Sequence, residues 1–99
     1  MSKTIKKSLT GEATAYCIKG TTSTGSQTGP GTIAVDPKVI PYHKKLHVSW
    51  TGGSYDGESL DTGKACKQGK TICDLWFNTS KECRDFGRKE VTVTWEESV

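Results

Sequence analysis

The sequence predicts a small, mainly β domain whose strands form a barrel. Strand-like runs recur along its 99 residues, glycine-rich segments separate them, and one segment has the pattern of a helix. Many short strands joined by glycine-rich turns are typical of barrels and sandwiches, and we favour the barrel. The length allows one hydrophobic core, and hydrophobic residues make up only 32% of the chain.

Five segments carry strand signals, with frequent β-branched and aromatic residues. In two of them apolar and polar residues alternate, so one face of each strand would be buried. The expected strands cover residues 13–18, 32–35, 45–50, 72–77 and 90–95, and the two alternating faces carry Leu46, Val48 and Trp50, and Val91, Val93 and Trp95.

Residues 80–87, SKECRDFG, have the pattern of a short helix. Thr79 or Ser80 can cap its N-terminus, Glu82 lies near its first turn, and Gly87 can end it. Loops are expected at the glycines between the elements, which are residues 20–31, Gly52, Gly53, Gly57 and residues 63–69.

The charge pattern argues against a nucleic-acid partner, and the distribution of apolar residues argues against a membrane span. The net charge is +3, and the lysine pairs 6–7 and 44–45 lack the interleaved aromatics of nucleic-acid binders. No apolar stretch approaches about 18 residues, so we expect no membrane span. The first seven residues resemble the start of a signal peptide, but no apolar segment follows them. We therefore expect an excised domain, a phage product or a module of a larger assembly.

Four cysteines allow either disulfides or reduced thiols. Cys17, Cys66, Cys73 and Cys83 contain no C-x-x-C pair, so we expect no structural zinc. Four cysteines permit three complete pairings, between which the residues alone do not choose. The two histidines have no convincing catalytic partner, and nothing in the sequence calls for a metal or cofactor.

Three aspartates stand in or beside apolar segments, unlike the other acidic residues. Asp36 precedes Pro37 and could cap a turn or support a nearby site. Asp61, in LDTG, could form an Asx-turn or point into a cleft. Asp74, in TICDLWF, would share a strand face with Ile72 and Trp76.

Asp74 is the strongest candidate for a catalytic group. Desolvation beside apolar side chains favours the protonated form of a carboxyl, which is the form a general acid needs. The alternative is a structural aspartate paired with a lysine or a backbone amide.

Six segments together resemble the 3D domain, a family named for three aspartates. They are ATAY (13–16), TSTG (22–25), GTIAVDPKVIP (31–41), LDTG (60–63), CDLWF (73–77) and FGRKEVTV (86–93). The resemblance runs from about residue 12 to 95 and implies a six-stranded double-psi β-barrel with one or two short helices. It places the domain at residues 12–96, with residues 1–11 as an N-terminal extension that we expect to be flexible.

The resemblance also implies an activity. The family is related to the catalytic barrel of membrane-bound lytic transglycosylase A and to muralytic proteins of Gram-positive bacteria. These enzymes cleave the β-1,4 bond between N-acetylmuramic acid and N-acetylglucosamine and leave a 1,6-anhydro sugar. Carried over, Asp74 is the general acid and base, Asp61 lines the same groove, and Asp36 supports it. The alternatives are a barrel that binds cell-wall glycan without cutting it, and a structural module of a phage or spore particle.

Further expectations follow from the resemblance. Glycan strands of peptidoglycan would be the partner, and the location would be extracellular or in the cell wall. The groove would bind the sugar or its peptide through Thr24, Thr62, Gly63 and Lys64, although Lys64 stands where the family commonly has a second glycine. The cysteines would pair as Cys17–Cys83 and Cys66–Cys73, the second bridge closing the loop that leads into Asp74.

Overall fold

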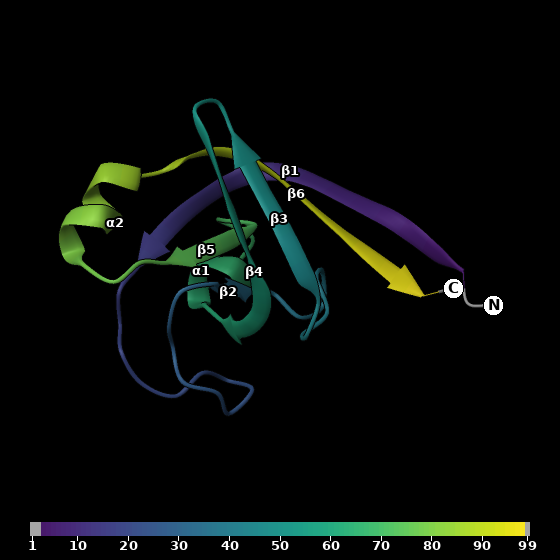
Figure 1. Ribbon diagram of the computed structural model, residues 1–99, viewed down its shortest axis with the longest axis horizontal. Coiled ribbons are helices and arrows are strands. Elements are labelled where there is room, and N and C mark those ends of the chain that lie inside the picture. Colours follow the sequence, from purple (N-terminus) through teal and green to yellow (C-terminus); the bar gives the residue numbers. More distant parts are fainter. Residues whose placement is uncertain (1–2, 99) are drawn as a thin grey trace.

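A computed structural model describes residues 3–98 as a closed barrel of six strands with two short helices (Figure 1). Around the barrel the strands follow the order β1-β5-β2-β4-β3-β6. The elements are β1 (Thr4–Tyr16), β2 (Thr32–Val35), β3 (Lys45–Trp50), β4 (Gly53–Thr62), α1 (Lys64–Lys67), β5 (Cys73–Trp76), α2 (Ser80–Phe86) and β6 (Lys89–Ser98).

The barrel mixes parallel and antiparallel pairs. β1 runs parallel to β5, and β2 runs parallel to β4, while the other four neighbouring pairs are antiparallel. Strands close in sequence are thus often not neighbours in space, and loops must cross the barrel ends to connect them. The predicted class, a small six-stranded barrel that is mainly β, is confirmed.

β1 and β6 form a long two-stranded ribbon. They pair from Thr4 opposite Ser98 to Ala13 opposite Lys89, and Figure 1 shows their ends running together toward the two termini. Residues 4–11, expected to be a flexible extension, therefore form the first part of a strand. Met1 and Ser2 lie outside the described residues.

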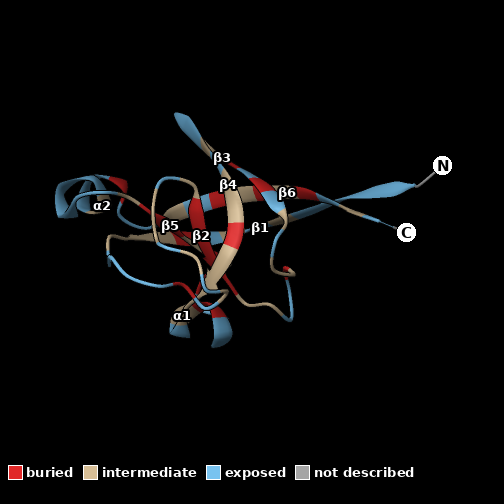
Figure 2. Ribbon diagram, turned by 60° about the horizontal axis from the view of Figure 1, so that its bottom comes forward, coloured by how far each residue is buried: buried red, intermediate tan, exposed pale blue. Residues whose placement is uncertain are grey.

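The core fills the barrel interior with aliphatic side chains, and Figure 2 shows the buried segments on its central strands. Both alternating faces predicted from the sequence point inward: Val48, Val91 and Val93 are at most 1% exposed. In β5, Cys73 and Leu75 are fully buried, which leaves Asp74 between them on the opposite face.

The sequence predicts loops at Gly53 and Gly57, which lie in β4, and at residues 63–69, which contain α1. β4 contains Gly53 and Gly57, which disfavour strands on propensity alone. The structure gives a reason for Gly57: a Cβ atom there would lie 2.8 Å from the carbonyl carbon of Gly31 and collide with its oxygen. Gly31 itself has a φ of +88°, which favours glycine. The two glycines allow the chain before β2 to approach β4.

α2 agrees with the sequence analysis. The hydroxyl of Thr79 accepts a hydrogen bond from the backbone N–H of Glu82, and Gly87 follows the last turn with a φ of +66°. The short α1 begins directly after the LDTG segment and places Cys66 in the interior. Within residues 3–98, neither helix is long and apolar enough to cross a membrane.

The close approach at Gly57 predicts a large effect of a single methyl group. We expect Gly57→Ala to lower the free energy of unfolding by about 2 kcal/mol or more, because the new Cβ collides with backbone that has little room to move. Gly29→Ala is the control, since a Cβ at that position meets nothing within 4 Å. Urea denaturation of both variants measures the difference, and equal stability of the two would contradict this explanation of the glycine.

Candidate active site

A cavity of about 240 Å³ is lined by residues of β1, β2, β4 and β5 and of the segments that follow β1 and β4. Asp61 and Asp74, two of the three aspartates predicted to act together, both line it. Strand pairing brings them there: Asp74 is opposite Ala34 of β2 in the β2–β5 pair, and Ala34 is opposite Asp61 in the β2–β4 pair. Residues far apart in sequence thereby share one site.

Asp74 is held by hydroxyl groups on one side of its carboxyl. Its Oδ1 accepts hydrogen bonds from Thr14 Oγ1 at 2.5 Å and from Thr71 Oγ1 at 3.1 Å. Thr14 is its register partner in the β1–β5 pair, and Thr71 is buried. Its Oδ2 contacts the Cys66 thiol, with Sγ at 3.6 Å. Because a thiol is a weak donor, Oδ2 is the less firmly bonded oxygen.

Gly63 leaves space beside that same oxygen. A Cβ atom at position 63 would lie 3.0 Å from Asp74 Oδ2, which is tighter than ordinary contact. The backbone of Gly63 is extended, with a φ of −134°, so its conformation does not itself require glycine. The glycine of LDTG is thus explained by the close approach of the Asp74 carboxyl.

Asp61 has a different environment. Its Oδ1 accepts hydrogen bonds from the backbone N–H and the hydroxyl of Ser23, both at 3.0 Å, and from the backbone N–H of Thr62 at 2.9 Å. Its Oδ2 accepts one from the Tyr16 hydroxyl at 3.2 Å. The carboxyl of Asp61 thus accepts hydrogen bonds from four donors. Burial, with help from Asp61, raises the pKa of Tyr16, which therefore stays a neutral donor.

Asp36 takes the turn-capping role that the sequence left open. Its Oδ1 accepts a hydrogen bond from the backbone N–H of Lys38 at 3.0 Å, and its carbonyl accepts from Val39 and Ile40. It is not among the residues that line the cavity. Asp36 thus caps the turn after β2, and its supporting role at the site stays a prediction.

The four expected substrate-binding residues divide into two groups. Thr62 and Gly63 line the cavity, although the Thr62 hydroxyl donates to the carbonyl of Val35 at 2.7 Å. Thr24 lies outside the cavity lining, and its hydroxyl donates to the carbonyl of Leu60 at 2.7 Å, which ties the loop to β4. Lys64 is exposed at the start of α1 and also lies outside the lining.

Sequence reasoning missed several groups that build the site. Tyr16 and Ser23 lie in the segments ATAY and TSTG, whose resemblance to the family was noted without a role for either residue. Thr14, which donates to Asp74, also lies in ATAY and was given no role. Thr71 donates to the same carboxyl, but threonines are frequent in this chain, and no sequence signal separates Thr71 from the others.

Neither predicted disulfide is present in the structure, in which all four cysteines are free thiols. Cys66 instead contacts Thr71, Asp74 and the carbonyl of Ala34. Burial raises the pKa of Cys66 to about 12 and also raises that of Cys73. Cys17 lies near α2, with its Sγ 3.6 Å from the hydroxyl of Ser80.

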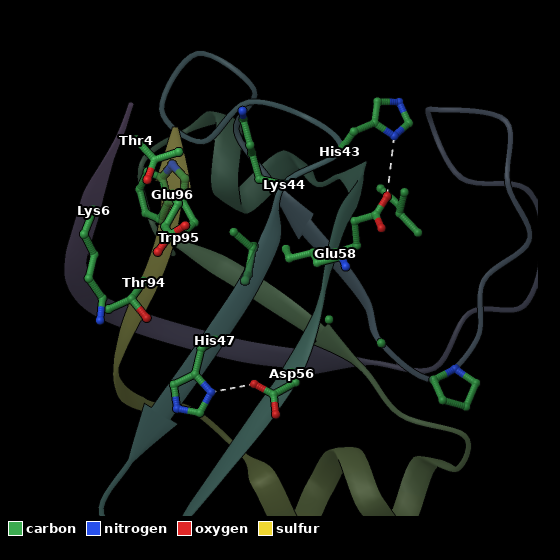
Figure 3. A pocket seen from close by; sticks show the side chains of 16 residues that line it. Thr4, Lys6, His43, Lys44, His47, Asp56, Glu58, Thr94, Trp95 and Glu96 are labelled. Carbon is green, nitrogen blue, oxygen red and sulfur yellow. Dashed lines mark hydrogen bonds and ion pairs between the residues drawn. The ribbon is translucent and has the colours of Figure 1, made fainter. Parts of the chain in front are cut away.

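A larger groove of about 1000 Å³ lies on another part of the surface, over β3, β4, β6 and the start of β1 (Figure 3). Two histidine–carboxylate contacts lie along it, between Nδ1 of His43 and Oε2 of Glu58 at 3.6 Å and between Nδ1 of His47 and Oδ1 of Asp56 at 2.5 Å. Lysines and carboxylates balance one another among its lining residues, half of which are exposed. None of the three aspartates lines it, so we take the smaller cavity as the candidate active site.

Among the described residues, no three or more His, Cys, Asp or Glu side chains gather to hold a metal ion.

Residues 31–95, well over half of the chain, match the family model of the 3D domain. The chain belongs to the 3D domain family. The resemblance noted from the sequence is thereby confirmed, including segments that build the cavity around Asp61 and Asp74.

Two relatives come from Bacillus subtilis (strain 168). The SPbeta prophage-derived uncharacterized protein YorM is 35% identical over 92 residues, covering 83% of this chain and 38% of that protein. The cell wall-binding protein YocH is 35% identical over 96 residues, covering 88% of this chain and 32% of that protein. The chain thus spans about a third of the length of these relatives.

The buried thiols predict that stability falls as the pH rises. A thiol in the unfolded chain has a pKa of about 8.5, whereas that of folded Cys66 is about 12. Above pH 8.5 the unfolded state therefore releases protons that the folded state keeps. The stabilisation is full below this pH and is lost as the pH approaches 12, with a slope of at most about 1.4 kcal/mol per pH unit for each thiol.

Urea denaturation under reducing conditions between pH 8 and 9.5 measures this slope. Cys66→Ser is the matched variant, because a hydroxyl keeps the hydrogen bonds but does not titrate in this range. We expect the variant to have a shallower dependence on pH than the wild type. Identical slopes would show that Cys66 ionises equally in both states.

Proposed function

We propose that this domain is a peptidoglycan lytic transglycosylase with Asp74 as its general acid and base. The observation that carries the proposal is the Asp74 carboxyl in the cavity, with Oδ1 held by two threonine hydroxyls and Oδ2 beside Gly63. Family membership supports a role at the cell wall, as does the name of one relative, a cell wall-binding protein. The proposed location is accordingly the cell wall, with glycan strands as the partner.

The first step needs a proton on Asp74. Because hydroxyl groups donate to Oδ1, the proton belongs on Oδ2, from which it passes to the oxygen that leaves the muramyl C1. The C1–O bond breaks, and positive charge develops on the sugar ring. The Asp61 carboxyl lines the same cavity and is proposed to stabilise that charge.

In the second step, Asp74 Oδ2 takes the proton from the muramyl 6-hydroxyl, whose oxygen forms the new bond to C1. One proton enters and one leaves the same carboxyl, so atoms and charge balance without water. The attacking hydroxyl belongs to the same sugar, which gives it a high effective concentration. A single carboxyl therefore serves both steps, and a second one with the separation of a hydrolase pair is not needed.

A second function is a barrel that binds cell-wall glycan without cutting it. The name of YocH favours this alternative, and so does the small size of the cavity. A structural role in a phage particle is a third, which the prophage origin of YorM favours. The three functions differ in whether the protein binds peptidoglycan and whether it releases products.

We expect purified peptidoglycan incubated with the protein to release 1,6-anhydromuropeptides, detected by mass spectrometry. Asp74→Asn should lower this release at least about 100-fold, because an amide cannot donate the proton. Asp85→Asn, at an exposed aspartate on α2 that pairs with Lys81, should leave it unchanged. Binding without products would favour the binding module, and products with reducing ends would indicate hydrolysis instead.

Gly63→Ala tests access to Asp74 separately from its chemistry. We expect the added Cβ to displace the carboxyl and lower product release about tenfold or more, because it would lie 3.0 Å from Oδ2. Stability should change little, since the extended backbone at this position accepts alanine. Thermal unfolding measured alongside the product assay distinguishes this result from misfolding, and full activity would contradict the assignment of Oδ2.

A further inference from the structure

Ile18 is the most exposed large apolar side chain among the described residues, at 73% exposed. It follows the end of β1 and lines the cavity that holds Asp61 and Asp74. An exposed isoleucine needs no explanation when it stands alone on a surface, but this one stands at the rim of the candidate active site.

The position of Ile18 is fixed by the buried core. Its carbonyl accepts a hydrogen bond from the indole N–H of Trp76 at 2.9 Å, and Trp76 is only 5% exposed. Trp76 belongs to β5, the strand that carries Asp74, and pairs with Tyr16 of β1. The backbone at Ile18 is therefore held relative to Asp74 while its side chain faces solvent.

The cavity lining contains both apolar and polar groups. Ile18, Ala34 and the Tyr16 ring supply apolar surface, while Asp61 and Asp74 supply carboxyl oxygens. Threonines 21 and 28 add hydroxyl groups on the loop after Ile18. Such a lining suits a ligand that is polar around most of its edge and carries a small apolar group.

We propose that Ile18 contacts the methyl of a sugar N-acetyl group and gives the cavity a preference for N-acetylated glycan. The inference rests on the proposed function, in taking an amino sugar of peptidoglycan as the occupant. The N-acetyl methyl is an apolar group present on both sugars of the strand. A branched aliphatic side chain matches a methyl group, whereas flat sugar faces stack on aromatic rings.

The test compares two preparations of the same peptidoglycan. Both are chemically N-deacetylated, and then one is re-N-acetylated while the other is N-formylated. The two differ by one methyl group on each acylated nitrogen and carry the same charge, and amines of the stem peptides are capped in both. Binding is measured by sedimentation with the Asp74→Asn protein, so that no substrate is consumed.

We expect the Asp74→Asn protein to bind the N-acetyl preparation about fourfold more tightly than the N-formyl one, the effect of one buried methyl. Adding Ile18→Val should preserve this preference. Adding Ile18→Thr, which has nearly the shape of valine but carries a hydroxyl in place of one methyl, should abolish it. Val39→Ser, at an exposed apolar residue outside the cavity, should have no effect.

Each outcome bears on the inference. A preference that survives Ile18→Thr, or equal binding of both preparations, would overturn the role of Ile18 and leave glycan binding intact. If the protein binds neither preparation, the proposed function fails and the inference fails with it. Loss of preference in Ile18→Thr alone supports the contact.

Discussion

The barrel and its candidate site both depend on the way β5 is buried between β1 and β2. This strand has four residues and pairs on both sides, parallel to β1 and antiparallel to β2. Cys73 and Leu75 point into the core and are fully buried, which forces Asp74 to the opposite face. A shift of one residue in this pairing would put the carboxyl in the core, and the cost of burying it there makes the register well defined.

The two carboxyl groups of the cavity are chemically equal, but they differ in the hydrogen-bond donors that surround them. Asp61 is satisfied by four donors, three of which come from Ser23 and the adjoining Thr62 backbone. Asp74 has hydroxyl donors on one oxygen and a weak thiol donor on the other. This difference is the basis of the separate roles proposed for the two carboxyl groups.

Several parts of the fold could be predicted because local signals agree with the final structure. Apolar and polar residues alternate in the strand at residues 45–50, and α2 has a threonine cap and a terminal glycine. In both elements the local sequence signal therefore agrees with the tertiary structure. β4 could not be predicted in this way. Its glycines disfavour a strand by local propensity. Position 57 needs a glycine because the backbone of Gly31, which is far away in sequence, leaves no room for a Cβ atom there.

The state of the cysteines also could not be predicted from local sequence signals. Their spacing is compatible with disulfides, but the short helix α1 turns Cys66 toward Thr71 and Asp74, where it contacts the candidate acid as a thiol. The sequence by itself determined that this is a small β domain of the three-aspartate type, because hydrophobic alternation and short motifs are local properties. Only the tertiary structure decided that Asp61 and Asp74 share a cavity while Asp36 caps a turn, because strand order brings together residues that the chain keeps apart.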